Sequence, residues 1–294
     1  MRIDLNCDMG ESFGPWKMGF DEEMMRYISS ANVAGGFHGG DPHVMRKTVA
    51  LAKENGVAVG IHSGYRDLVG FGRREIQMSP DEVHDELLYQ LGALREFARY
   101  YDMEVQHVKP HGALYMVAAR DEELSRAIIE AIQRVDPGLH LFCMQSSMTY
   151  ELAKKLDQPV VAEFYADRGY NDDGQIVFTR AVTEELDPEE VGARVVRAVT
   201  EGKVTAESGN DIEVGADSVC VHGLLALDEE LRDGAVVFGL HLVEGLHHLD
   251  QAHGVPGRDA VALVDVGVAL RVGTAVEGAR HLRLYGLVGQ FSLL

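Results

Sequence analysis

Short runs of alternating apolar and polar residues recur along the chain, and longer stretches with helical spacing separate them. The first run spans residues 2–8, where Asp4, Asn6 and Asp8 occupy alternate positions. Because side chains in a strand alternate between two faces, these three polar groups share one face. Two carboxylates and an amide on one face of a strand either face water or line a polar cavity.

Six more strands follow along the chain, with helices between them. The further predicted strands are residues 30–43 with a glycine-rich end, 57–64, 105–112, 139–144, 160–164 and 218–223. The predicted helices are residues 21–30, 41–55, 79–101, one that ends near 135, a short one that ends near 156, and 188–200. Asp41 before Pro42 and Ser79 before Pro80 are typical helix starts, because a side-chain acceptor caps the first turn and proline fits the first helical position.

The alternation of strands with helices predicts parallel strands joined by right-handed crossovers. Seven such units without a linker or a change in composition favour a single closed or nearly closed β/α barrel, and a doubly wound open sheet is the alternative. The first turn lacks the G-x-G-x-x-G pattern and the chain lacks G-x-x-x-x-G-K-[ST]. The sequence therefore predicts neither a dinucleotide site nor a P-loop.

Charge and cysteine content narrow the class of partner and the compartment. The 294 residues carry a formal net charge of −20 at pH 7, which argues against nucleic acid and anionic membranes as partners because both would repel the chain. The cysteines Cys7, Cys143 and Cys220 are far apart and odd in number, which favours reduced thiols. Without a signal pattern or a long apolar run, we expect a cytoplasmic protein with no membrane span.

Ionisable residues stand close to glycine at the ends of six predicted strands. They are Asp8, His38, His62, Lys109 with His111, Glu163 with Asp167 and Arg168, and His222. The loops that follow the strands form the active sites of β/α barrels, so we expect these groups to line one cavity. Carboxylates, imidazoles and an ammonium group suit either a divalent metal that activates water or metal-free acid–base attack on an acyl group.

Lys109 and His111 flank Pro110 and point to the same side at a period of two. Lys109 pairs either with a substrate carboxylate or oxyanion, or with Glu163 in a buried salt bridge. Under the first alternative, we predict that alanine at position 109 or 111 abolishes turnover and leaves the fold intact.

Six segments that carry these residues resemble one known family. The segments are 4–14 (DLNCDMGESFG), 31–42 (ANVAGGFHGGDP), 70–74 (GFGRR), 108–115 (VKPHGALY), 163–170 (EFYADRGY) and 219–223 (VCVHG). Together they are similar to the LamB/YcsF family, whose bacterial members are the A component of ATP-dependent 5-oxoprolinase. The resemblance implies a seven-stranded, distorted β/α barrel related to polysaccharide deacetylases. It also implies opening of the 5-oxoproline lactam to glutamate, driven by ATP hydrolysis, in a complex with B and C subunits.

The resemblance further suggests roles for individual residues. The expected catalytic residues are Asp8, His38, Lys109, His111 and Glu163. The expected substrate-binding residues are Asn6, Asn32, Arg73, Asp167, Arg168 and His222. The expected cofactors are ATP, handled with the partner subunits, and a divalent metal held by Asp8, His38 and His62. The alternatives are a metal-dependent, deacetylase-like hydrolase that acts on a carbohydrate or another amide, and a catalytically silent binding barrel.

Two departures from the family pattern bear on the site and on the domain boundary. Gly35 stands where the family usually has a cysteine, and Leu224 follows Gly223 where the family usually has an acidic residue and a short final helix. We therefore expect a barrel domain at 1–223 and a divergent extension at 224–294. The extension either packs on the barrel or makes a homo-oligomer contact, or it results from a shifted reading frame. Its sparse helical periodicity predicts fewer regular helices than in the barrel.

Overall fold

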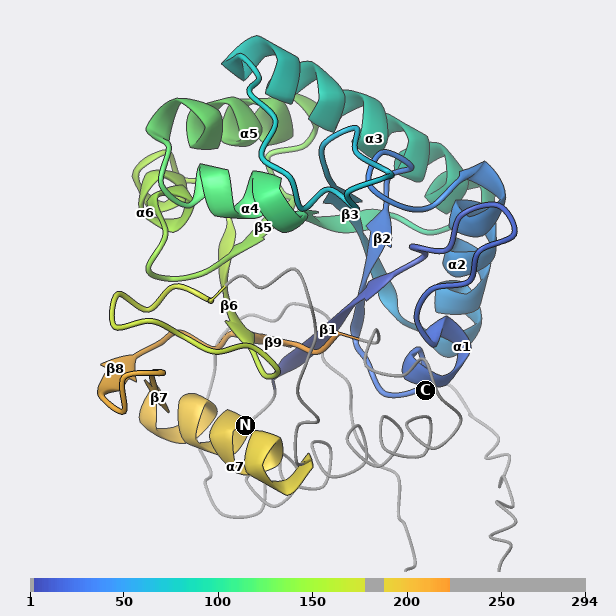
Figure 1. The fold of residues 1–294 in the computed structure, drawn as a ribbon. Helices are drawn as coiled ribbons and strands as arrows, with labels where there is room; N and C mark the ends of the chain where they lie inside the picture. Colours follow the sequence, from blue (N-terminus) through green and yellow to red (C-terminus); the bar gives the residue numbers. More distant parts are fainter. Residues whose placement is uncertain (1–2, 178–187, 223–294) are drawn as a thin grey trace, which may run out of the picture. The chain divides into compact units, whose positions relative to one another are not determined.

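Seven parallel strands close into a barrel in the order β1-β2-β3-β4-β5-β6-β9 (Figure 1). The computed structural model describes residues 3–177 and 188–222, so the predicted extension at 224–294 lies outside the described residues. The strands are β1 (Asp4–Met9), β2 (Ser30–Ala34), β3 (Ala58–Ser63), β4 (Val105–Pro110), β5 (His140–Cys143), β6 (Val160–Tyr165) and β9 (Ser218–Cys220). The closed order confirms the predicted barrel and excludes the open sheet.

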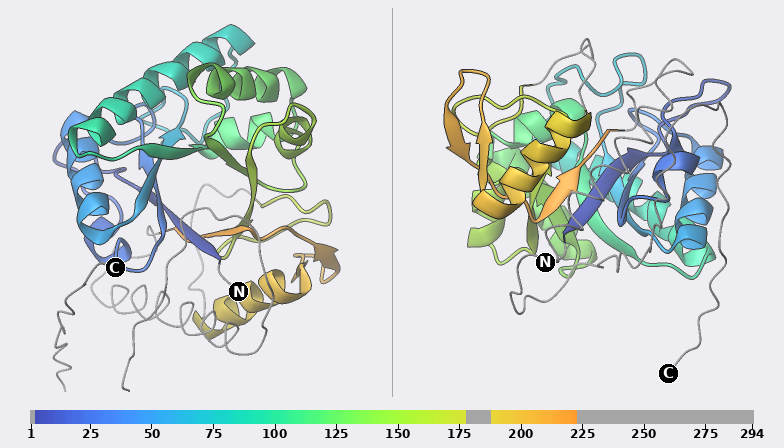
Figure 2. Two further views of the ribbon diagram at one scale, coloured as in Figure 1. Left: turned by 180° about the vertical axis from the view of Figure 1, so that it is seen from behind. Right: turned by 90° about the horizontal axis from the view of Figure 1, so that it is seen from below.

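Helices cover the outside of the barrel strands, as two further views also show (Figure 2). They are α1 (Asp21–Met24), α2 (Pro42–Asn55), α3 (Pro80–Tyr100), α4 (Gly112–Ala118), α5 (Glu122–Val135), α6 (Met148–Lys155) and α7 (Pro188–Glu201). The predicted starts of α2 and α3 are confirmed, because Asp41 accepts hydrogen bonds from two backbone N–H groups and Ser79 forms a capping box with Glu82. Among the described residues, no helix is long and apolar enough to cross a membrane.

Three predicted elements differ from the structure. The helix expected at 21–30 is only the short α1, because Ser30 already belongs to β2. The single helix expected to end near 135 is two helices, and Asp121 caps the second by accepting a hydrogen bond from the Leu124 N–H at 3.0 Å. The antiparallel pair β7 (Lys203–Thr205) and β8 (Asp211–Glu213) was not predicted.

The polar face of β1 points into the barrel. Asp4 accepts hydrogen bonds from the hydroxyl groups of Ser29, Ser30 and Ser218 at 2.5, 2.7 and 2.5 Å, and Asn6 donates to Ser218 at 2.7 Å. The residues between them belong to the apolar core: Leu5, Cys7 and Met9. Of the two alternatives for this face, the structure therefore supports a polar interior in which buried groups are satisfied by hydrogen bonds.

Candidate active site at the barrel mouth

A small cavity opens at the C-terminal ends of the barrel strands. Its volume is about 40 Å³, enough for about three water molecules. Its lining includes ionisable and aromatic residues from β1, β3, β4, β6 and the loops that follow the strands: Asp8, Glu11, His62, Arg73, Lys109, His111, Tyr115, Tyr165, Arg168 and His222. Of the other strand-end residues, Glu163 contacts Lys109 directly and His38 contacts Glu11. The structure thus brings the strand-end groups together at one mouth, as expected.

The ammonium group of Lys109 is buried at the centre of this site. Its Nζ lies 2.9 Å from both Asp8 Oδ1 and Glu163 Oε1, and it donates hydrogen bonds to Asn6 Oδ1 at 3.3 Å and Cys220 Sγ at 3.1 Å. Burial alone would lower the pKa of Lys109, but the charge of Asp8 and the Cys220 and Glu163 groups raise it well above its usual value. Lys109 is therefore a fixed cation, and the buried salt bridge to Glu163 is present.

The Asp8 carboxylate connects this cation to two imidazoles. Its Oδ1 accepts a hydrogen bond from Lys109 at 2.9 Å and another from Asn32 at 2.9 Å. Its Oδ2 lies 3.1 Å from His62 Nε2 and 3.4 Å from His222 Nε2. Burial would raise the pKa of Asp8, but His62 and Lys109 hold it well below its usual range. Asp8 therefore stays ionised at neutral pH.

Asn6 and Asn32, which the sequence suggests as substrate-binding residues, lie one layer deeper in the barrel. Asn32 donates to Asn6 Oδ1 at 2.7 Å, and its own Oδ1 lies 2.8 Å from His107 Nε2. Neither amide lines the cavity. Their position corrects the expectation of direct substrate contact, because both side chains instead position Lys109 and Asp8.

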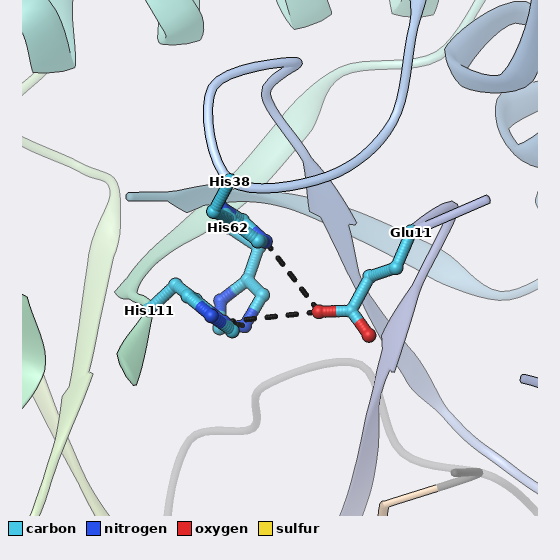
Figure 3. A group of neighbouring side chains, drawn as sticks. All are labelled: Glu11, His38, His62 and His111. Atoms are coloured by element: carbon cyan, nitrogen blue, oxygen red, sulfur yellow. Dashed lines mark hydrogen bonds and ion pairs between the residues drawn. The ribbon is translucent and has the colours of Figure 1, made fainter. Parts of the chain in front are cut away.

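Three imidazoles and one carboxylate form a buried cluster beside Asp8 (Figure 3). His62 lies on β3, and the other three residues follow strands: Glu11 after β1, His38 after β2 and His111 after β4. The rings of His38 and His111 stack with their centroids 3.6 Å apart, and His62 lies perpendicular to both. Gly72 permits this arrangement, because a Cβ atom there would lie 2.7 Å from both stacked side chains and its φ is +62°.

Burial sets the protonation of this cluster. It holds the pKa of His38 well below its usual value, and the nearby His62 acts in the same direction. Burial also holds the pKa of His111 well below its usual value, with a further contribution from His38. For Glu11, burial and the charge of Asp8 raise the pKa to about 7. The cluster thus contains neutral imidazoles and a carboxyl group that titrates near neutrality.

The rim of the cavity is cationic. Arg73 and Arg168 both line it, and burial followed by the charge of Arg168 lowers the pKa of Arg73. His222 lies beside them, and its Nδ1 is 2.9 Å from both carboxylate oxygens of Asp167. Asp167 itself does not line the cavity. Two guanidinium groups at one opening attract a small anion.

Sequence reasoning missed three residues of the site. Glu11 belongs to the cluster, Tyr115 donates a hydrogen bond to Glu163 Oε2 at 3.1 Å, and Cys220 contacts Lys109. Burial raises the pKa of the Cys220 thiol well above its usual value, so the thiol stays neutral. The available signal for Glu11 was Gly10, since the other strand-end residues were chosen for a nearby glycine.

The donor atoms of Glu11, His38, His62 and His111 all lie within 4.8 Å of one another, so this group could hold a metal ion. The set differs from the expected Asp8, His38 and His62, because Glu11 and His111 take part and Asp8 lies beside the group. Apart from metal binding, the site offers a fixed cation, an ionised carboxylate and imidazoles around a space for water. Such an arrangement suits acid–base chemistry on a small anionic substrate.

The family model for the LamB/YcsF family matches residues 3–228 of this sequence. The chain belongs to the LamB/YcsF family. A relative from Pseudomonas aeruginosa, named as an A-type 5-oxoprolinase subunit, is 55% identical over 222 residues, which cover 75% of this chain and 88% of the relative. Proteins with the same kind of name from Pyrococcus abyssi and Bacillus subtilis are 51% and 46% identical over 226 and 223 residues. Both alignments cover 76% of this chain, with 88% and 87% of the respective relatives.

A solved structure from the same family has the same fold. The crystal structure of a lactam utilization protein from Thermus thermophilus superposes with a TM-score of 0.77 at 43% identity. The superposition covers 85% of this chain and 98% of that protein. The barrel described above is therefore the architecture of this family.

Proposed function

We propose that this chain is the barrel component of an ATP-dependent 5-oxoprolinase, which opens the cyclic amide of 5-oxoproline to give glutamate. The observation that carries the proposal is the identity of 46–55% to proteins named as A-type 5-oxoprolinase subunits. The family match at residues 3–228 includes every residue of the mouth. The cavity supports the proposal with a cationic rim above a buried acid–base cluster. A lactam with one carboxylate is the class of substrate that such a site fits.

The proposed complex supplies ATP chemistry through partner subunits. The relatives are named as one kind of subunit, which implies an assembly of more than one kind of chain. This sequence contains no P-loop motif, so a nucleotide site on a partner is the simpler arrangement. We therefore infer that B and C subunits bind to this chain and handle ATP.

Arg73 and Arg168 are the proposed carboxylate-binding residues. Guanidinium groups pair with carboxylates through parallel N–H···O hydrogen bonds, and both side chains line the cavity. The cavity of about 40 Å³ holds about three waters, so a five-membered ring enters only when a rim side chain moves aside. Arginine side chains at the rim are long enough to make this movement.

His222 is the proposed proton-transfer residue on the cavity side. Its Nδ1 faces the Asp167 carboxylate at 2.9 Å, which favours a proton on Nδ1 and leaves Nε2 as the acceptor. Nε2 lies 3.4 Å from Asp8 Oδ2, so an imidazolium formed there would be stabilised by an ionised carboxylate. Lys109 contributes by keeping Asp8 ionised.

The experiment is a reconstitution. Purified full-length chain is mixed with its B and C partners, 5-oxoproline and ATP, and glutamate is measured with time. We expect glutamate only when all proteins and ATP are present, and loss of activity in His222→Ala. Glutamate formation by the partners without this chain would refute the proposal.

A second candidate is a stand-alone, metal-dependent hydrolase of the deacetylase type. The cluster of Glu11 with three histidines favours it, because metal-activated water hydrolyses amides without ATP. Release of acetate from N-acetylated sugars by the chain alone, without ATP or partners, would support this candidate over the first.

A further inference from the structure

The four donor atoms of the Glu11–His38–His62–His111 cluster have the spacing of a metal coordination sphere. His62 Nε2 and His111 Nδ1 are 2.9 Å apart, His38 Nε2 and Glu11 Oε1 are 3.4 Å apart, and His111 Nδ1 and Glu11 Oε1 are 3.7 Å apart. Bonds of about 2.0–2.1 Å from a tetrahedral Zn²⁺ place donor atoms about 3.3 Å apart. The three distances lie on both sides of this value.

Hydrogen bonds on the far sides of two rings fix which nitrogen atoms carry lone pairs. His62 Nδ1 lies 3.0 Å from the carbonyl oxygen of Lys109, and His111 Nε2 lies 2.8 Å from the carbonyl oxygen of Phe71. A carbonyl oxygen only accepts, so each of these nitrogens carries its hydrogen. In the neutral rings, His62 Nε2 and His111 Nδ1 are then both acceptors, yet they face each other at 2.9 Å. Two facing lone pairs repel unless a cation lies between or beside them.

The other two members of the cluster have buried polar atoms without hydrogen-bond partners. They are His38 Nδ1, His38 Nε2 and Glu11 Oε1. The His38 and Glu11 residues are 1% and 4% exposed, and buried polar atoms in proteins nearly always find a hydrogen-bond partner. A ligand that accepts electron pairs from all four residues would satisfy His38 Nε2 and Glu11 Oε1 together.

We propose that Glu11, His38, His62 and His111 bind one divalent transition-metal ion of the Zn²⁺ class. Backbone carbonyls that hold the far nitrogens of ligand histidines are the usual outer support of such sites. Three imidazoles and one carboxylate select Zn²⁺, Fe²⁺, Co²⁺ or Mn²⁺, whereas Mg²⁺ and Ca²⁺ prefer oxygen ligands. Asp8, 3.1 Å from His62 Nε2, lies next to the ion and is not one of its four ligands.

This site deepens the proposed hydrolase function but does not require it, since it would bind metal without substrate, ATP or partners. The competing explanation of the short distance between His62 and His111 is a shared proton next to Asp8. A proton needs no metal, so metal content separates the two explanations.

The test is metal binding by the untagged full-length chain. After treatment with a chelator, the chain is equilibrated with ZnCl₂ and the bound metal is measured by mass spectrometry. We expect one Zn²⁺ per chain, and Co²⁺ in its place should give the visible absorption of a four-coordinate site. Glu11→Gln, which keeps the side-chain volume, and His38→Asn should each weaken binding at least about tenfold.

The matched control is His84→Asn, because His84 lies on the surface of α3 and pairs with Asp85. This variant should bind Zn²⁺ as the natural chain does. Circular dichroism verifies that each variant is folded, and Glu11→Gln provides the result if His38→Asn is not. Absence of stoichiometric binding of Zn²⁺, Co²⁺ and Mn²⁺, or undiminished binding by both ligand variants, would overturn the inference. Lack of 5-oxoproline turnover in a chain that binds metal would reject only the proposed reaction.

Discussion

Lys109 shows how one residue carries both stability and chemistry at this site. It is buried between two carboxylates, so each carboxylate depends on it for charge compensation. A buried ion pair contributes little net stability compared with an apolar replacement, but removal of one partner leaves the other charge buried and unpaired. The fold and the site therefore share the same interaction.

Lys109→Ala should lower the free energy of unfolding by about 3–5 kcal/mol, because Asp8 and Glu163 lose their shared cation. Urea denaturation followed by circular dichroism measures this change. The control is Lys155→Ala on the surface of α6, which should change stability by less than about 0.5 kcal/mol. This expectation replaces the one from sequence alone, in which activity was lost and the fold was unaffected. A Lys109→Ala chain as stable as the control would show that the carboxylates become protonated without cost.

Arg73→Ala and Arg168→Ala should each lower kcat/KM for 5-oxoproline in the reconstituted complex by roughly 10- to 150-fold. This range corresponds to the loss of one charged hydrogen bond of about 1.5–3 kcal/mol. 2-Pyrrolidinone, the same ring without a carboxylate, should lose no further activity in these variants. Arg66→Ala is the control, because Arg66 pairs with Glu86 outside the cavity. Equal losses with both ring compounds would mean that the arginines do not bind the carboxylate.

Much of the site could be predicted from the sequence because β/α barrels place strand ends together. Asp8, His62, Lys109, His111 and His222 were found by this rule and line the cavity. The identity of the metal-binding group could not be found in this way. It depends on which ring nitrogen faces a carbonyl oxygen, and that orientation arises only when loops from different strands meet.

At the scale of elements, local signals were read correctly and long-range ones were missed. The caps of α2 and α3 involve residues within a few positions of each other, so the sequence contains the whole interaction. The break between α4 and α5 has neither glycine nor proline, and only the cap by Asp121 marks it. The β7–β8 hairpin was missed because each of its strands has only three residues.

The packing of β3 against β4 rests on one glycine. A Cβ atom at Gly60 would lie 2.1 Å from Cδ2 of His107, whose ring also stacks on Phe142. Gly60→Ala should therefore lower the free energy of unfolding by at least about 1–3 kcal/mol, since the buried ring has to move. Thermal denaturation measures the change.

The matched control for Gly60→Ala is Gly92→Ala in α3. Gly92 is exposed, and a Cβ atom there meets nothing within 4 Å. Alanine should stabilise the helix by about 0.5–1 kcal/mol at this position. Opposite signs for the two substitutions would confirm that the space beside His107 decides the result, and equal signs would contradict it.

At the scale of the whole molecule, the barrel depends on its last strand. β9 pairs with β1 on one side and with β6 on the other, and Ser218 is the partner of both Asp4 and Glu163 in the register. The Ser218 hydroxyl also donates to Asp4 and accepts from Asn6. Residues far apart in the sequence therefore close the structure, which explains why the sequence pattern alone left an open sheet as an alternative.

A chain that ends at residue 228 should fold, whereas one that ends at 216 should not. The longer chain keeps β9 and all residues that match the family, and the shorter one leaves the edges of β1 and β6 unpaired. Circular dichroism and size-exclusion chromatography measure the outcome: we expect one cooperative transition for the longer chain, and aggregation or a broad transition for the shorter one. Cooperative unfolding of the shorter chain at the same temperature would contradict the role of β9. Failure of the longer chain to fold would contradict the proposed domain boundary near residue 223, because residues beyond 228 would then be required by the barrel.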